Sequence, residues 1–191
     1  ALHNLSLQEF LNRDDVAIYN SIPTVEGALM MAIQNTDFTI HNSISLVLGL
    51  GRVGLSMARV LHALGAHVRV GARKSADLAR IFEMGLTPFH IDELSQHVDD
   101  ADLIFNTIPH LVITAKVIAN MQHHALIIDL ASKPGGTDFR YAEKRGIKAI
   151  LAPGLPGIVA PKTAGQITAN ILSRLVFEQM VNGRNQNGSQ G

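Results

Sequence analysis

A glycine-rich turn between a short apolar run and a helical pattern is the feature that most restricts how this chain can fold. The run covers residues 44–48 and reads Ile-Ser-Leu-Val-Leu. The turn that follows consists of Gly49, Leu50, Gly51, Arg52, Val53 and Gly54. Gly49 allows a tight turn, Gly51 lets a phosphate approach the backbone, and Gly54 lets the helix pack closely on the strand. We therefore expect these six residues to hold a dinucleotide pyrophosphate at the N-terminus of a helix.

The residues after the next strand indicate which dinucleotide is bound. Helical spacing predicts a helix over 55–64, and an apolar run predicts a strand over 66–72. NAD-binding domains usually place an acidic residue near the end of that strand, but residues 71–72 are Gly-Ala. Arg73, Lys74 and Ser75 come next, and two cations with a hydroxyl suit a ribose 2′-phosphate. The pattern favours NADP; the alternative is a solvated basic loop in which Ser75 caps a helix over 76–84.

Strands and helices alternate along the rest of the chain, which predicts a parallel sheet covered by helices. Further strands are expected at 86–89, 102–107, 125–130 and 148–151. Further helices are expected from Asp92, over 111–119 and 138–145, and from 160 or 162 to 179. The predicted fold class is α/β, a three-layer Rossmann-type doubly wound parallel sheet flanked by interdomain helices.

The two ends of the chain follow a different pattern. We predict a short helix over 2–13, a short strand within 14–21, and a helix over 25–34 capped by Thr24. Residues 182–191 are polar, which predicts disorder. The expected organisation is the end of a preceding domain or a linker at 1–23, a Rossmann domain with its connecting helices at 24–180, and a tail at 181–191. Because the chain opens on Ala1 rather than Met, we expect a processed chain or a fragment.

Composition narrows the functional classes. Among 191 residues, 16 Lys and Arg balance 16 Asp and Glu, so we expect neither a nucleic acid nor a membrane as partner. Cysteine is absent, which excludes disulfides and thiolate catalysis. His123 and His124 are adjacent rather than spaced as ligands, and we predict no metal site.

Ligands of open parallel sheets bind beyond the carboxyl ends of the strands, so the loops at 106–110, 129–136 and 153–157 are candidate site loops. Predicted cofactor contacts there are Thr107, Ile108, Pro109, Leu130, Ala131 and Ser132. Lys133 is a candidate anchor for a substrate carboxylate, Lys162 a cation facing the cleft, and His110 a proton-transfer group. The alternatives are ordinary surface charges for the two lysines and an exposed loop histidine. For Asp129 we favour a structural role.

These motifs together resemble the dipicolinate synthase A-subunit family. The matching segments lie at 20–28, 48–54, 71–75, 106–109, 129–139 and 152–165, within a region of roughly residues 18–180. The chain is also similar, more broadly, to D-2-hydroxyacid dehydrogenases and adenosylhomocysteinase. In such proteins two helices connect the cofactor domain to another domain, which implies connecting helices at 24–34 and 162–179 and a further N-terminal domain of about a hundred residues.

The resemblance implies a function. It implies NADP-dependent oxidation of dihydrodipicolinate or hydroxytetrahydrodipicolinate, a small dicarboxylate, to dipicolinate during sporulation, in the mother-cell cytoplasm. It also implies a B subunit that looks like a flavoprotein, and the architecture is compatible with a homo-oligomer. Three alternatives stay open: a regulatory nucleotide-binding domain without catalysis, a 2-hydroxyacid dehydrogenase-like enzyme, and a relative that uses bound NAD without net oxidation.

Overall fold

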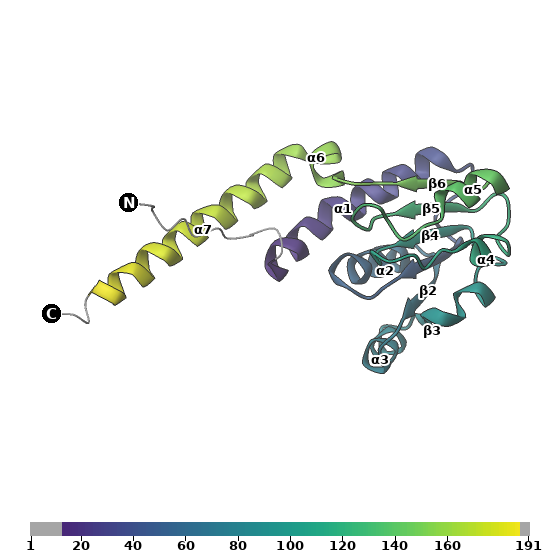
Figure 1. Cartoon of the computed structure of the whole chain (residues 1–191), viewed down its shortest axis with the longest axis horizontal. Helices are drawn as coiled ribbons and strands as arrows, with labels where there is room; N and C mark the ends of the chain where they lie inside the picture. Colours follow the sequence, from purple (N-terminus) through teal and green to yellow (C-terminus); the bar gives the residue numbers. More distant parts are fainter. Residues whose placement is uncertain (1–12, 188–191) are drawn as a thin grey trace.

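The computed structural model of the chain describes residues 13–187, and its centre is a six-stranded sheet in which all neighbouring strands are parallel. The strands are β1 (Ile44–Leu48), β2 (His67–Ala72), β3 (Thr87–His90), β4 (Leu103–Asn106), β5 (Leu126–Asp129) and β6 (Lys148–Leu151). Their spatial order is β3-β2-β1-β4-β5-β6, and Figure 1 labels all of these strands except β1. The order reverses between β1 and β4, and that is where dinucleotides bind in such sheets. The predicted α/β class and doubly wound parallel sheet are confirmed.

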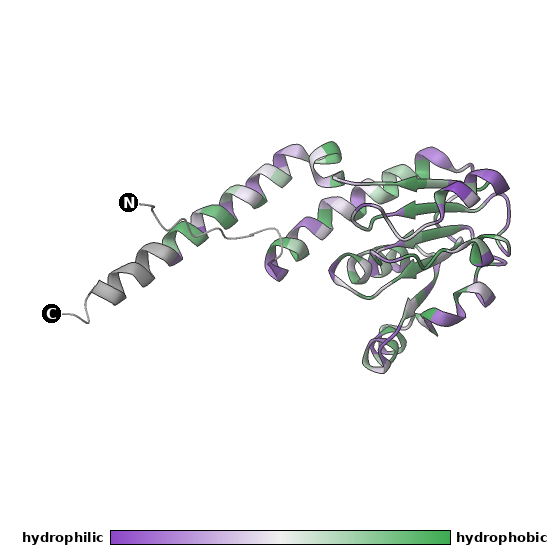
Figure 2. Ribbon diagram, in the orientation of Figure 1, coloured by the Kyte–Doolittle hydropathy of each residue, from purple (hydrophilic) through white to green (hydrophobic). Residues whose placement is uncertain are grey.

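Two apolar layers hold the helices on the two faces of this sheet. One layer joins the sheet to α1 (Asp14–Asn35), α2 (Arg52–Ala63) and α3 (Ser75–Glu83). The other joins it to the 3-10 helix η2 (Ile91–Gln96) and to α4 (Ala115–Ile118) and α5 (Phe139–Arg145). Side chains alternate along β1, with Val47 in the first layer and Leu46 and Leu48 in the second. Figure 2 shows apolar strands among the helices that surround the sheet, at the right of the view.

The first half of α1 corrects two predictions. Residues 14–21 are helical rather than a strand, and α1 continues through Pro23. Thr24 does not cap a helix, because its hydroxyl donates to the Asn20 carbonyl one turn earlier, 2.7 Å away. A proline inside a helix removes one backbone hydrogen bond, so local preference disfavours this conformation. Burial of Val16, Ser21 and Val25 along the same helix offsets that cost.

Several other boundaries also differ from those predicted. The helix expected from Asp92 is the 3-10 helix η2, and the helix expected over 111–119 is only the single turn α4. α7 (Pro161–Asn187) continues into the segment expected to be disordered, since extending a formed helix costs less than starting one. The helix predicted over 2–13 lies almost wholly outside the described residues, and so do residues 188–191.

A pair of helices projects from the sheet. The short helix α6 (Leu155–Val159) follows β6 and packs on α1, where a Cβ at Gly27 would lie 3.1 Å from the Leu155 Cβ. α7 then runs away from the sheet beside the first half of α1 (Figure 1). We call the first half of α1 (residues 14–23) and α7 the helix pair. The predicted domain boundary at 23/24 falls within α1, and the division into domains stays a prediction.

α1 is the one helix among the described residues whose length and composition would suffice for a membrane span. Core helices and signal sequences pass the same test, so this is weak evidence for a span. Val25, Ala28 and Ala32 of α1 are buried in the layer against the sheet.

Candidate dinucleotide site

The glycine turn has the shape that a pyrophosphate requires. Gly49 adopts φ +94°, and a Cβ there would lie 2.7 Å from the Thr107 hydroxyl. A Cβ on Gly54 would lie 2.0 Å from the Gly49 carbonyl oxygen, so α2 packs directly on the turn. A Cβ on Gly51 would meet no atom within 4 Å, which leaves open space in front of the backbone. The three glycines therefore serve the tight turn, the close helix packing and the open approach respectively.

The start of α2 supplies free backbone donors beside this space. Gly51 is the N-cap, and the Leu55 N–H makes the first helical hydrogen bond, 2.9 Å to the Gly51 carbonyl. The N–H groups of Arg52, Val53 and Gly54 consequently have no acceptor within the helix and can receive an anion. The Arg52 side chain is directed elsewhere, because it pairs with Asp14 of α1 at 2.8 Å. Leu50 is half-buried against the core.

The end of β2 offers cations instead of a carboxylate. A Cβ on Gly71 would lie 2.7 Å from the Phe89 ring, and Ala72 is buried, so neither position has room for an acidic side chain. Arg73, Lys74 and Ser75 follow as exposed residues. Ser75 is the first residue of α3 and Lys74 is its N-cap, with no side-chain cap hydrogen bond. The interpretation of Ser75 as a helix cap is therefore wrong, and its hydroxyl has no partner in the described part of the chain.

A buried polar network, which the motifs indicated only in part, joins the ends of β4 and β5. Asp129 is fully buried and accepts four hydrogen bonds. One carboxylate oxygen accepts from the Asn106 amide at 3.0 Å and from the Ala131 N–H at 3.1 Å; the other accepts from the Gly136 N–H at 2.8 Å and the Thr137 hydroxyl at 2.6 Å. The network fastens the loop after β5 to the end of β4. Its signal in the sequence was a carboxylate that closes an apolar run.

The predicted cofactor contacts of these two loops differ in exposure. The Thr107 hydroxyl donates a hydrogen bond to the Leu48 carbonyl, 2.8 Å away, and so stabilises the residue that directly precedes the glycine turn. Ile108 and Leu130 are half-buried and Ala131 is buried, whereas Pro109 and Ser132 are exposed. Their contacts with a cofactor stay predictions.

The three candidate catalytic side chains are exposed and come from separate segments. His110 lies in the loop after β4, and Lys133 lies in the loop after β5, next to a cis peptide bond to Pro134. Lys162 lies in the first turn of α7. Within the described residues, these side chains make no hydrogen bond or ion pair with one another. β4 and β5 are neighbours, so the loops of His110 and Lys133 share one edge of the sheet. Their catalytic roles stay predictions.

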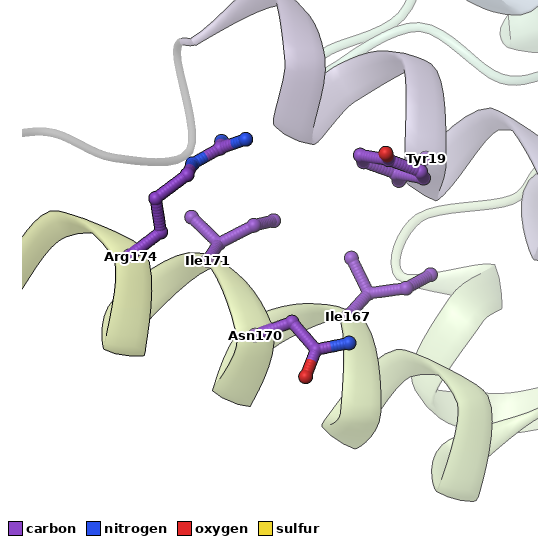
Figure 3. A pocket seen from close by; sticks show the side chains of 5 residues that line it. All are labelled: Tyr19, Ile167, Asn170, Ile171 and Arg174. Carbon is purple, nitrogen blue, oxygen red and sulfur yellow. The ribbon is translucent and has the colours of Figure 1, made fainter.

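One hollow of the surface adjoins the ends of the strands, and another lies between α1 and α7. The first, of about 280 Å³, lies beyond the carboxyl ends of β2, β3 and β4, and we call it the edge groove. Its lining includes Arg73, Ile91, Asp92, Leu111, Thr114 and Lys116. The second, of about 190 Å³, lies within the helix pair, where Tyr19 of α1 faces Ile167, Asn170, Ile171 and Arg174 of α7 (Figure 3). Only the edge groove adjoins the predicted nucleotide loops.

Charged side chains of the described residues give no sign of a metal centre. No group of three His, Asp or Glu side chains is close enough to hold an ion in the part of the chain that the structure describes. The pKa changes fall outside the candidate site. In the helix pair, the hydrogen bond from Arg13 lowers the pKa of Asp15 to about 2, and elsewhere the hydrogen bond from Arg69 lowers the pKa of Asp100.

Comparison with known proteins agrees with this geometry. The family model "Alanine dehydrogenase/PNT, C-terminal domain" matches residues 25–187. The dipicolinate synthase A subunit of Bacillus subtilis (strain 168) is 65% identical over 172 residues, which cover 90% of this chain and 58% of that protein. The crystal structure of the corresponding protein from Bacillus halodurans matches with a TM-score of 0.89 at 66% identity, over 90% of this chain and 59% of that one. The crystal structure of the Bacillus subtilis protein matches with a TM-score of 0.91 at 63% identity, over 93% and 59%.

The resemblance drawn from the motifs is thus confirmed. The chain spans less than two thirds of the length of these relatives. The matched domain is of the dehydrogenase type, which indicates a nicotinamide cofactor.

Proposed function

Because the chain belongs to the alanine dehydrogenase/PNT C-terminal domain family, we propose that it is the NADP-binding part of an oxidoreductase subunit that forms dipicolinate. The proposed substrate is dihydrodipicolinate or hydroxytetrahydrodipicolinate, in the mother-cell cytoplasm of a sporulating bacterium. A flavoprotein-like B subunit is the proposed partner. The names of the relatives designate one subunit of an enzyme and so support a partner subunit, while its flavoprotein-like character comes from the resemblance alone. The single observation that carries the proposal is the glycine turn, with its open space at Gly51 beside the free N–H groups of α2.

The residues present fit a dinucleotide phosphate. The turn leaves room for a pyrophosphate, and the start of α2 provides donors for it. NAD-binding domains hold the ribose with a carboxylate at the end of β2. Here Gly71 packs on Phe89, which leaves no room for an acidic side chain, and the exposed residue that follows the strand is Arg73. An exposed cation with no ion-pair partner in the described residues favours the 2′-phosphate of NADP.

The proposed reaction places definite demands on the protein. When bound, NADP⁺ would supply the hydride acceptor for this oxidation. Dihydrodipicolinate would also lose one proton to become dipicolinate, and the hydroxytetrahydro form would lose water in addition. The loop after β5, fastened by Asp129, is where the protein would position the ring. Lys133 is the proposed partner of a substrate carboxylate, Lys162 a second cation, and His110 the group that takes the proton.

A second candidate is a nucleotide-binding domain that does not turn over substrate by itself. The observation that favours it is the exposure of all three candidate catalytic side chains without contact among them. A substrate site with only these groups would leave a small dicarboxylate largely in water, whereas ligand sites usually enclose their ligand.

Binding of NADPH and NADH to two glycine variants tests the proposal. We expect Gly51→Leu to weaken binding of both nucleotides at least tenfold, because the side chain would project into the proposed phosphate space, where a Cβ meets no protein atom within 4 Å. Gly165→Leu in α7 is the matched control, since a Cβ there also meets nothing within 4 Å. Nicotinamide fluorescence gives both dissociation constants and circular dichroism confirms folding. Equal affinities of the two variants for NADPH would overturn the proposal, and tighter binding of NADH than NADPH by the unaltered chain would overturn its NADP part.

A further inference from the structure

The edge groove contains a second cation that the sequence pattern did not indicate. The basic segment Arg73-Lys74-Ser75 is continuous in the chain, yet only Arg73 of the three lines the groove. The second cation is Lys116 of α4, more than forty residues after Arg73 in the chain. The connection that leaves the end of β4 places it in the lining of the groove. We propose that Lys116, with Arg73, recognises the 2′-phosphate of NADP and is a specificity-determining residue of the nucleotide site. This inference rests on the proposed function and adds to it a residue and a location.

The position of the groove supports this assignment. Arg73 follows the end of β2 directly, and Ile91 follows the end of β3. Leu111 and Thr114 lie in the connection that leaves the end of β4. β1, which carries the glycine turn, lies between β2 and β4. A dinucleotide whose pyrophosphate lies on that turn therefore has the edge groove within reach of its adenosine half.

The lining of the groove matches the chemistry of a phosphorylated adenosine. Ile91, Leu111 and Val117 contribute apolar side chains, and Leu111 is 60% exposed, so an apolar surface is open to a flat base. Arg73 and Lys116 make two cations against one carboxylate, that of Asp92. Asp92 lies 3.5 Å from the His90 ring, and its side chain is largely exposed. The groove thus combines an apolar surface with an excess of positive charge, as a base attached to a phosphate requires.

Lys116 has no ion-pair partner among residues 13–187, so its ammonium group is available. The Asn120 amide donates to the backbone carbonyl of Lys116 and not to its side chain. Arg73 is likewise exposed and makes no ion pair in these residues. Surface cations without a carboxylate partner can bind a phosphate without first breaking an ion pair. Their contacts with the 2′-phosphate should therefore contribute measurably to the affinity for NADP.

Binding of adenosine 2′,5′-bisphosphate and of adenosine 5′-monophosphate to the whole chain tests the role of Lys116. These two probes differ only in the 2′-phosphate and need no substrate. We expect Lys116→Ala to weaken binding of the bisphosphate about five- to tenfold and binding of the monophosphate less than twofold. Lys148→Ala, at the start of β6, is the matched control and should change neither affinity. Asp92→Asn should strengthen binding of the bisphosphate by a few fold, because it removes the opposing charge.

The outcomes separate this inference from the proposed function. Equal weakening of both probes by Lys116→Ala, or no weakening, would overturn the role of Lys116 while NADPH binding at the glycine turn could still hold. A larger loss of bisphosphate affinity in Lys74→Ala than in Lys116→Ala would also overturn it, since Lys74 does not line the groove. If the unaltered chain binds neither NADPH nor NADH, the proposed function fails, and the inference fails with it.

Discussion

The sheet and the helix pair of this molecule are held together in opposite ways. The sheet lies between two layers of buried side chains, and the one buried carboxylate among residues 13–187, that of Asp129, accepts from four donors. The helix pair shares a small cluster of Val16, Ile171 and Leu175, and exposes other large apolar side chains, such as Ile18 at 54% and Phe177 at 67%. The sheet region, which also exposes Phe82 and Leu111, has two extensive buried layers, whereas the helix pair has few buried side chains beside its exposed ones.

The two regions are nevertheless connected beside the nucleotide site. Arg52, inside the glycine turn, pairs with Asp14 at the start of α1, and the Ser21 and Ser56 hydroxyls are 2.9 Å apart. A rearrangement of the helix pair would therefore act on α2, whose first turn faces the proposed pyrophosphate. The nucleotide loops thus belong to the sheet with its two buried layers, whereas the buried cluster of the helix pair consists of three side chains.

The largest effect on stability is expected from the buried network of the sheet. Asp129→Ala leaves four donors without their acceptor, and each unsatisfied buried group costs about 1–3 kcal/mol. We expect the free energy of unfolding to fall by roughly 3 kcal/mol or more, as measured by urea denaturation with circular dichroism. Asp37→Ala, at an exposed residue, should change it by less than about 0.5 kcal/mol. A similar, small loss in both variants would contradict the view that the sheet depends on this network.

An intermediate and local effect is expected in the helix pair. Ile171→Ala removes one of three buried side chains in the small cluster, at a cost of about 2 kcal/mol. Hydrogen exchange should accelerate in α7 but not in β1, because the helix pair can open without unfolding the sheet. Leu172→Ala, one residue away on the exposed side, is the matched control and should leave exchange in α7 nearly unchanged. Equal acceleration in α7 and β1 would show that the two regions unfold together.

The smallest effect is expected from the ion pairs of the helix pair at low pH. Asp15 accepts from Arg13 and pairs with Arg174 of α7, and the hydrogen bond from Arg13 contributes most to lowering its pKa from 3.8 to about 2. A lowered pKa in the folded state means that this stabilisation is present above pH 3.8 and is lost as the pH falls toward 2.

Hydrogen exchange in α7, compared at pH 5 and at pH 2.5, measures this loss. Asp15→Asn should abolish the part of the pH dependence that comes from this carboxylate, and Asp37→Asn should not. Because Asp15 is at the surface, the change should be small and should shrink further at high salt. An unaltered pH dependence in Asp15→Asn would assign the effect to other groups.

Much of the fold could be predicted from the sequence because its signals are local. The glycine spacing, the apolar runs of β1, β4 and β5, and the change from strand to helical periodicity all lie within short windows. The failures occurred where distant contacts override local preference. Residues 14–21 became helix although Pro23 lies downstream in the same helix, and the helix expected over 111–119 shrank to the single turn α4.

The candidate site divides in the same way. The sequence alone determined the glycine turn, the missing carboxylate after β2 and the cations that follow it, because these depend on residues that are neighbours in the chain. Only the tertiary structure decided that Lys116 lines the edge groove with Arg73, while Lys74 and Ser75 do not. It also decided that Asp129 joins the ends of two strands. Such groupings depend on strand order and on the course of the connections, which periodicity within one segment does not specify.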